Sequence, residues 1–190
     1  MPLSPTPNIE THRWTRRQYE QMVEAGVLTE DDPVELLNGQ IVRMSPQSSR
    51  HATVVTLCHE ALVSITPPDH FIRVQAPLAL NDESEPEPDL ALVPGRPEAF
   101  WTQHPTTATL IVEVADTSLA KDRETKRPVY ARNGIPEYWI INLVDHCVEV
   151  YRTPHGDEYE SKHTVYRGDE ISDIQSLSAS LPVSHILPST

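Results

Sequence analysis

Two acidic side chains of this chain lie beside segments with the composition of strands. Asp89 follows Pro88, whose nitrogen cannot donate a ladder hydrogen bond, so we expect Asp89 at the start of a strand. Glu113 closes the apolar run Leu110-Ile111-Val112, where an ionised carboxylate is costly to bury unless a cation or a donor meets it. Mg²⁺ prefers oxygen ligands and needs only one or two protein carboxylates. We therefore expect Asp89, Glu113 and the carbonyl of Val114 to hold Mg²⁺ or Mn²⁺.

A lysine is the next candidate for chemistry at this site. Asp122, Lys126 and Tyr130 recur every four positions, so they share one face of a helix. An ammonium that faces the cation could orient or help deprotonate a water that attacks a phosphodiester, or offset charge on the phosphate, while the cation acts as a Lewis acid. The same spacing also describes an ordinary surface pair of Asp122 with Lys126. Glu35 is a further candidate acid, although its alternation with Val34 and Leu36 alone would make it solvent-facing.

Basic residues near these positions indicate a local phosphate-binding patch. The segment 121–132 contains five basic and two acidic residues. Unpaired N–H groups at the start of a helix near residue 50 would also favour an anion. The candidates for nucleic-acid contact are Arg43, Arg50, His51, Arg123 and Arg127. The alternatives are a solvated helix face for the arginines and a polar cap neighbour for His51.

Composition limits the partners that this chain can have. A net charge of −13 weakens unselective attraction to a polyanion, so any contact with DNA must be local. With 190 residues and 38% hydrophobic residues, the chain fits a single domain over residues 13–190 behind an extended or disordered lead over residues 1–12. Cys58 and Cys147 lack the spacing of a disulfide framework or a zinc site, and no segment has the apolar length of a membrane span. We expect a cytoplasmic protein.

The elements that position these residues follow from periodicity and turn signals. Thr15 with Gln18 forms a capping-box pattern, and Asn38-Gly39 suits the tight turn of a hairpin. A second helix from Ser49 to Ile65 has apolar residues at intervals of three and four. The predicted elements are a helix over 16–25, strands over 34–37 and 40–44, a helix over 49–65, strands over 71–80, 89–93 and 108–114, a helix over 123–132, and strands over 138–142, 147–152 and 162–167.

Together these elements predict an α/β or α+β fold with a mixed central sheet flanked by helices. The run from Ala108 to Val114 is apolar and β-branched, which indicates a central strand buried on both faces. Asp122 is the expected N-cap of the helix that follows, and Pro128 is an irregularity that could kink this helix. A turn is expected over residues 153–157.

The chain resembles the Uma-two family of restriction-endonuclease-like proteins, within the PD-(D/E)XK nuclease superfamily, over nearly its whole length. The resemblance is carried by Val34 to Ile41, His51, Glu87-Pro88-Asp89, Ile111 to Val114, Asp122-Arg123 with Lys126, Tyr130-Ala131, and Gly134 to Trp139. It implies a restriction-endonuclease-like core, with Asp89 and Glu113 as metal-binding acids and Lys126 as the motif lysine. Ala115 stands where a lysine would complete Glu-x-Lys, so the lysine must come from the following helix.

The leading hypothesis is a Mg²⁺-dependent DNA endonuclease in which Asp89, Glu113 and Val114 hold the cation, Lys126 positions water and Glu35 supports the site. A nuclease-like fold used only for binding or assembly is the rival, motivated by the acidic composition and by the displaced lysine. A hydrolase of small phosphoesters is a third hypothesis, and it would need no extended basic groove. We also expect a homodimer, since two-fold assemblies are common and can cover exposed strand edges.

Overall fold

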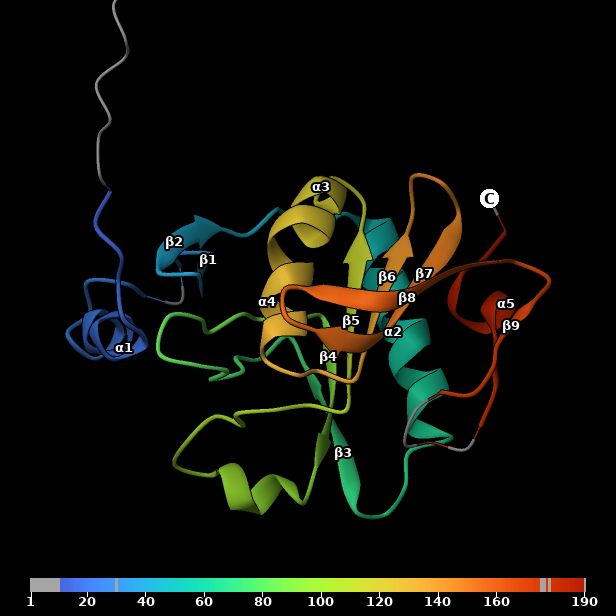
Figure 1. Cartoon of the computed structure of the whole chain (residues 1–190), viewed down its shortest axis with the longest axis horizontal. Coiled ribbons are helices and arrows are strands. Elements are labelled where there is room, and N and C mark those ends of the chain that lie inside the picture. The colour runs from blue at the N-terminus through green and yellow to red at the C-terminus, as the bar shows by residue number, and fades with distance from the viewer. Residues whose placement is uncertain (1–10, 30, 175–176, 178, 190) are drawn as a thin grey trace, which may run out of the picture.

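A six-stranded mixed sheet forms the centre of the structure, a computed structural model that describes residues 11–29, 31–174, 177 and 179–189 (Figure 1). The strand order is β3–β4–β5–β6–β7–β8, and within this sheet only the β5–β6 pair is parallel. The strands are β3 (His70–Val74), β4 (Leu90–Pro94), β5 (Leu110–Ala115), β6 (Glu137–Asn142), β7 (Cys147–His155) and β8 (Glu158–Tyr166). The predicted mixed sheet flanked by helices is confirmed. Most of the predicted lead over residues 1–12 lies outside the described residues.

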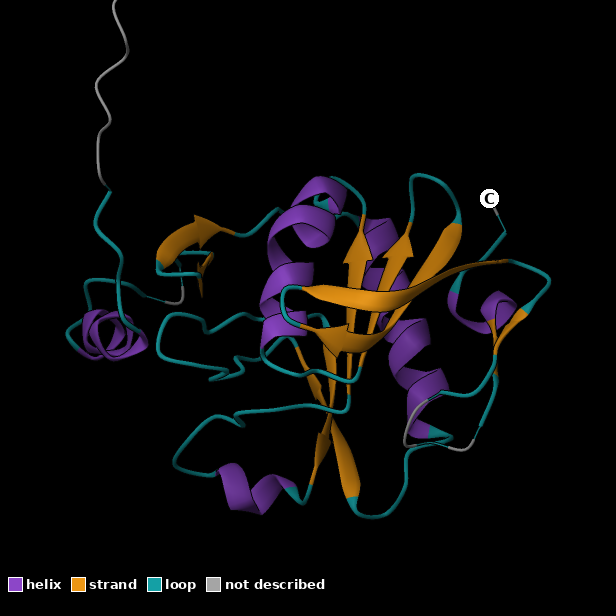
Figure 2. Ribbon diagram, viewed as in Figure 1, coloured by secondary structure: helices purple, strands orange, loops and turns teal. Residues whose placement is uncertain are grey.

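Helices cover both faces of the sheet (Figure 2). On one face α2 (Ser49–Val63) packs on the apolar side chains that point to it from β4, β5 and β6. The other face is covered by the helical segment between β5 and β6. Val112 and Val114 of β5 belong to the α2 side, and Ile111 and Ala115 belong to the opposite side. Burial on both faces explains why the sequence of β5 is an almost unbroken apolar run, as predicted.

The N-terminal arm, residues 16–29 and 31–43, lies beside the sheet at the left of Figure 1. It consists of α1 (Arg16–Glu24) and a hairpin of β1 (Val34–Leu37) and β2 (Gln40–Arg43). The predicted capping box at Thr15 is present, and the predicted turn at Asn38-Gly39 has positive φ at both positions. Backbone bonds join the hairpin to the loop that precedes β4: Gly39 N donates to Glu83 O at 2.7 Å, and Glu85 N donates to Leu36 O at 2.8 Å.

The segment predicted as one strand over residues 71–80 is a strand only as far as Val74. Gln75 has a φ of 46°, which ends the extended ladder, and Pro77 has no N–H to donate. Residues 78 and 79 are buried in a loop instead, where their N–H groups bond to the carbonyls of Pro86 and Pro105. The prediction of a strand is therefore wrong for the second half of this segment.

The helical segment before β6 begins earlier than predicted and contains a wide turn. It runs through α3 (Leu119–Lys121), a π-helical turn η2 (Asp122–Lys126) and α4 (Arg127–Arg132). Asp122 is inside the helix and not at its N-cap, because Asp122 N already bonds to Ser118 O. Pro128 cannot donate the regular bond to residue 124, and the wide turn just before it gives its ring room. The predicted irregularity is thus confirmed, as a π turn.

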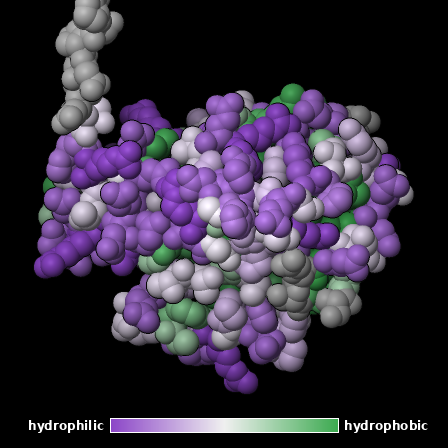
Figure 3. Space-filling view, viewed as in Figure 1, coloured by the Kyte–Doolittle hydropathy of each residue, from purple (hydrophilic) through white to green (hydrophobic). Residues whose placement is uncertain are grey.

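The remaining elements were not predicted from the sequence. A 3₁₀ turn, η1 (Pro97–Phe100), precedes β5, and after β8 the chain adds β9 (Glu170–Ile171), β10 (Leu181–Pro182) and α5 (Val183–Ile186). The turn predicted over residues 153–157 is shorter than expected, because β7 continues to His155. Within the described residues, every helix is too short or too polar to cross a bilayer. Most of the surface shown in Figure 3 is hydrophilic, as the charged composition requires.

Candidate functional site

A polar pocket of about 160 Å³ lies where β5 ends, between the hairpin of the N-terminal arm, the start of α2 and the helical segment after β5. Asp89, Glu113, Lys126 and Glu35 all line this pocket, together with Val114. The structure therefore brings together all five residues that the sequence nominated for catalysis and metal binding, although they come from four separate parts of the chain. All four of the ionisable groups are buried.

Asp89 lies just before β4 and is fixed by three donors. Its Oδ2 accepts from Val114 N at 2.8 Å and faces His51 Nε2 at 3.1 Å, and its Oδ1 accepts from Gln75 Nε2 at 3.2 Å. Burial opposes ionisation, but the bond and charge of His51 and the bond from Val114 hold the pKa of Asp89 below its ordinary value. This carboxylate is therefore charged at neutral pH.

The carbonyl of Val114 is directed toward Asp89. Within a strand, the N–H and C=O of one residue point to the same edge, because opposed residues can exchange both bonds. Val114 N donates to the Asp89 side chain, so the Val114 carbonyl faces the same side, away from β6. The pairing of β4 with β5 covers β5 residues 110–112 and stops short of this position. This orientation suits the predicted metal ligand.

The side chain of Glu113 lies on the face of β5 that is covered by the α3–α4 segment, and it contacts that segment. Its Oε1 accepts from Lys126 Nζ at 2.8 Å and from the Tyr130 hydroxyl at 2.6 Å. The predicted shared face of Lys126 and Tyr130 is confirmed by these two contacts. Among the hydrogen bonds between described residues Glu113 uses only Oε1, so Oε2 is the oxygen left for a ligand in the pocket.

Glu35 enters the same cluster from β1. Its side chain is fully buried, with Oε1 at 3.0 Å from Lys121 Nζ and Oε2 at 3.0 Å from Lys126 Nζ. Oε2 also accepts from the backbone N–H of Glu87 at 3.2 Å. The solvent-facing alternative for Glu35 is wrong, because the inner face of the hairpin packs on the helical segment and on the loop before β4.

Of the acids in this cluster, Glu113 is the one whose pKa is raised into the neutral range. Burial and the charges of Asp122, Asp89 and Glu35 raise the pKa of Glu113 to about 8, against the lowering effect of Lys126. Burial would lower the pKa of Lys126, but the acids that face it raise that pKa above its ordinary value. Lys126 is thus a permanent cation. For Glu35, burial is outweighed by Lys126 and Lys121, which lower its pKa.

The donor set fits a divalent cation that keeps waters. Asp89 and Glu113 line one pocket and influence each other's charge, and the Val114 carbonyl is the third oxygen. Within residues 11–29, 31–174, 177 and 179–189, no group of three or more His, Cys, Asp or Glu side chains is arranged to hold a metal ion. A closed cage is expected for zinc, whereas Mg²⁺ uses one or two carboxylates and completes its shell with water and substrate.

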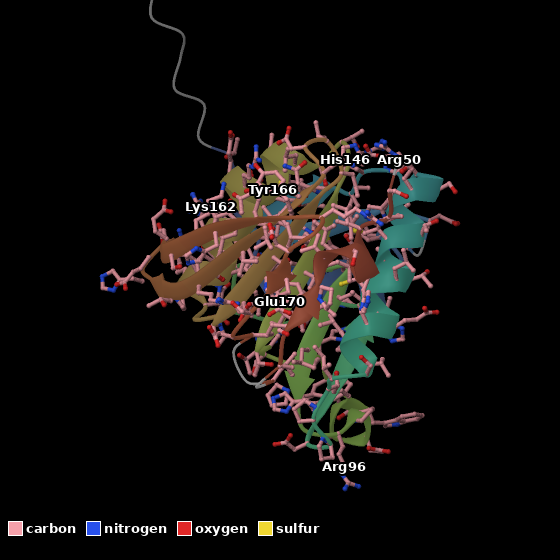
Figure 4. All side chains as sticks on the ribbon, turned by 90° about the vertical axis from the view of Figure 1, so that its right-hand side faces the viewer. Arg50, Arg96, His146, Lys162, Tyr166 and Glu170 are labelled. Carbon is pink, nitrogen blue, oxygen red and sulfur yellow. The ribbon has the colours of Figure 1, made fainter. Side chains whose placement is uncertain are left out.

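The five candidates for nucleic-acid contact are not gathered into one patch. His51 lines the pocket, at the first turn of α2, where the cap by Ser48 fixes its backbone. Arg50 lies at the same end of α2, is exposed (Figure 4), and pairs at 2.8 Å with Asp116, which lines the pocket. Arg43 is exposed on β2. Arg123 and Arg127 point instead to β7 and β8.

Arg123 and Arg127 already have acidic partners on those strands. Arg123 Nε donates to Glu149 Oε1 at 3.0 Å, and the Arg127 guanidinium bonds to Glu158. These pairs neutralise the charge that a phosphate would require. Of the predicted patch, the structure therefore places only Arg43, Arg50 and His51 near the pocket.

Several residues of the pocket were missed by sequence reasoning. Gln75 reaches Asp89 only because the positive φ at residue 75 turns the chain, and nothing in the sequence signals that turn. Lys121 is one of the five basic residues of the segment 121–132, and its Nζ donates to Glu35 Oε1 at 3.0 Å and to the Arg43 carbonyl at 3.4 Å. Glu87 could have been found, since it stands two residues before Asp89 and lines the same pocket.

Comparison with known proteins finds both a family and similar solved structures. Residues 16–184 match the model of the family described as "Uma2: Putative restriction endonuclease". The structure is similar to one described as a "putative nuclease belonging to DUF820" from Anabaena variabilis ATCC 29413, with a TM-score of 0.67 and 16% identity, over 86% of this chain and 94% of the other. A search of curated proteins finds no match to the sequence. At this identity the structural likeness supports the fold alone.

Proposed function

This chain belongs to the Uma2 restriction endonuclease family, and on that premise we propose that it is a metal-dependent endonuclease that hydrolyses phosphodiester bonds in DNA. The observation that carries the proposal is the convergence of Asp89, Glu113 and the Val114 carbonyl on one pocket that also contains a buried lysine. These oxygens would hold Mg²⁺ or Mn²⁺. The bound ion would supply Lewis acidity and a water of lowered pKa.

Lys126 acts in this proposal as a fixed positive charge. Its ammonium is held at 2.8 Å from Glu113 and 3.0 Å from Glu35, and the raised pKa excludes a role as a neutral base at ordinary pH. A preorganised cation stabilises charge that develops on a phosphate in the transition state. Of the roles expected for this lysine, the short contacts and the raised pKa support charge stabilisation over deprotonation of water.

Glu35 and Tyr130 position the lysine and the carboxylate. Glu35 has no exposed surface and is bonded to two lysines, so its part is to fix Lys126 and to keep it charged. The Tyr130 hydroxyl donates to Glu113 Oε1, which leaves the other oxygen for the cation. Asp89 is oriented in the same way by His51 and Gln75.

The experiment is cleavage of supercoiled plasmid by purified protein with Mg²⁺ or Mn²⁺, compared with the Asp89→Ala and Glu113→Ala variants. Asp69→Ala is a matched control, because Asp69 is an exposed aspartate at the opposite end of the β3–β4 pair. We expect the wild type and the control to nick the plasmid and the two site variants to be inactive with unchanged circular dichroism. Cleavage retained by both site variants would reject the assignment.

A non-catalytic binding or assembly role is the second candidate, and one observation favours it. Lys126 already bonds to Glu113 and His51 already faces Asp89, so the two acids have internal partners without a metal. Calorimetry separates the two roles: the absence of Mg²⁺ and Mn²⁺ binding at pH 8 would support the binding role and contradict the enzyme.

A homodimer remains part of the proposal. The sheet is open, with β3 and β8 at its two edges, and an exposed edge strand is a surface on which a second copy can pair. Light scattering of the full chain measures the mass directly, and a monomer at micromolar concentration would contradict this part without affecting the metal site.

A further inference from the structure

A second pocket of about 560 Å³ lies between α1 and the loop that follows η1. Its size is within the range of small-molecule sites. In Figure 3 the outline of the molecule is indented on the left, between the block that contains α1 and the lobe that contains η1. The residues that matter for its chemistry are Arg16, Glu20, Glu85, Phe100, Trp101 and His104. Within the described residues this pocket shares no lining residue with the candidate metal site.

Glu85 places a buried, unsatisfied acceptor in this pocket. The residue is 6% exposed, and its Oε2 has no hydrogen-bond partner among the described residues. Burial, the charge of Glu20 and a side-chain hydrogen bond with Glu20 raise the pKa of Glu85 to about 7, while the charge of Arg16 opposes the shift. Since Glu20 and Arg16 line the same pocket, the carboxyl group of Glu85 faces its interior. A buried acceptor without a donor is costly, so a ligand with N–H groups would satisfy it.

Trp101 gives the pocket an exposed aromatic surface. Its side chain is 91% exposed, which is unusual for a tryptophan, and it stands at the mouth of the pocket next to the half-buried Phe100. His104 lines the same mouth and is held by Arg73 at 3.2 Å. An exposed indole beside a pocket with a hydrogen-bonding wall is suited to a flat heteroaromatic ring, which would stack on the indole and direct its polar edge inward.

We propose that this pocket binds an unpaired guanine base, stacked on Trp101 and bonded through its N–H edge to Glu85 and Glu20. Guanine presents two adjacent N–H donors, N1–H and the 2-amino group, on one edge, and the two neighbouring carboxyl groups are acceptors for both. Adenine and cytosine present one amino group beside a bare ring nitrogen, which would repel a carboxylate. Thymine presents one N–H between two carbonyls.

The position of the pocket connects it to the proposed cleavage site. Glu85 and Asp89 are four positions apart in the chain, so their Cα atoms are at most about 14 Å apart. A strand with one guanine in this pocket would therefore place a phosphate a few nucleotides away near Asp89. This link to strand cleavage depends on the proposed function, whereas the binding of the base does not.

The test measures binding without cleavage. Fluorescence anisotropy is recorded in EDTA for labelled 12-mers of thymidine that contain one central guanine, hypoxanthine or 7-deazaguanine. Hypoxanthine lacks the 2-amino group, and 7-deazaguanine keeps both donors. We expect the guanine and 7-deazaguanine strands to bind about equally, and the hypoxanthine strand to bind about tenfold more weakly.

Variants locate the site. Trp101→Ala should weaken binding of the guanine strand by about fivefold or more, the loss of one stacking contact. Glu85→Gln, which keeps the shape of the side chain, should abolish the difference between guanine and hypoxanthine. Tyr166→Ala is the matched control, since Tyr166 is a 57% exposed aromatic residue on β8 and is seen in Figure 4 far from Arg96 at the start of η1. This control should bind like the wild type.

Free guanosine monophosphate is used as a competitor to distinguish a mononucleotide site from a strand site. Competition at concentrations similar to those of the strand would identify a mononucleotide site. Competition only at much higher concentrations would identify a strand site. Both outcomes support the base pocket. Equal affinity of wild-type protein for the guanine and hypoxanthine strands, or no effect of Trp101→Ala, would overturn the proposal. Because no metal is present, these results stand whether or not the protein cuts plasmid.

Discussion

Binding of a divalent cation should release a proton from Glu113, and this is the most direct consequence of the cluster around Lys126. Glu113 is buried among Asp122, Asp89 and Glu35, which raise its pKa to about 8. With that pKa, about nine-tenths of the protein carries a proton on Glu113 at pH 7. A cation must displace that proton before it can bind the carboxylate.

The expected magnitude follows from the same pKa. Each pH unit below 8 leaves about tenfold fewer ionised Glu113 side chains, so the affinity for Mn²⁺ should rise about 50-fold between pH 6 and pH 8 and then level off. Calorimetry at pH 7 in buffers with different ionisation enthalpies should show about one proton released per ion. His51 adds to the slope at the acidic end, because Asp89 raises its pKa too.

The control for this experiment is Glu113→Gln, whose amide oxygen can still accept from Lys126 and Tyr130. Any ion that this variant still binds should show only the shallower pH dependence that His51 causes. The reasoning would be refuted by equal Mn²⁺ affinity of the wild type at pH 6 and pH 8, together with no proton released in any buffer.

Three further predictions concern stability. Glu113→Gln should stabilise the metal-free protein above pH 8 relative to wild type, because a carboxyl with a raised folded pKa contributes stability that is present below pH 4.5 and lost as the pH rises through about 8. Thermal melting of both proteins at pH 6 and pH 9 measures this, and the same difference in melting temperature between variant and wild type at both pH values would contradict it. Lys126→Met should cost about 3–5 kcal/mol in urea unfolding at pH 8, because Glu113 and Glu35 lose their shared cation, and a cost below about 1 kcal/mol would show that the pair is not buried in solution. Gly39→Ala should lower the melting temperature, since φ is +73° and a Cβ would lie 2.9 Å from Arg13 Cβ, and an unchanged melting temperature would mean that the turn can relax.

The sequence was sufficient for the residues whose local pattern and tertiary position agree. The run that ends at Glu113 is buried on both faces, and the four-residue spacing of Lys126 and Tyr130 does bring both to one oxygen. The turn at Asn38-Gly39 was predictable because few dipeptides tolerate positive φ twice. The prediction of one domain over residues 13–190 stays a prediction.

Other features depended on distant contacts that no local pattern contains. Glu35 has the alternation of a solvent-facing residue, and only docking of the hairpin on the α3–α4 segment buries it. Gln75 enters the pocket through a single unusual φ angle. Arg123 and Arg127 had the charge for a phosphate patch, but β7 and β8 supply the acids that pair with them. The sequence shows which groups can ionise, whereas their partners are decided by tertiary packing.

The hairpin that contributes Glu35 belongs to the N-terminal arm, outside the six-stranded sheet. Backbone bonds, the two lysine contacts and the bonds of Asn38 with Ser84 and Arg132 attach it, but neither of its strands pairs with the six-stranded sheet, so we expect this arm to open as a unit while the sheet stays folded. Heat or mild denaturant should then inactivate the protein before the far-ultraviolet circular dichroism changes. Hydrogen exchange would show the amides of β1 and β2 unprotected earlier than those of β5. Opening of the arm would then set the highest temperature at which the protein is active. A crosslink between the arm and α3 would raise that temperature without any change to the sheet.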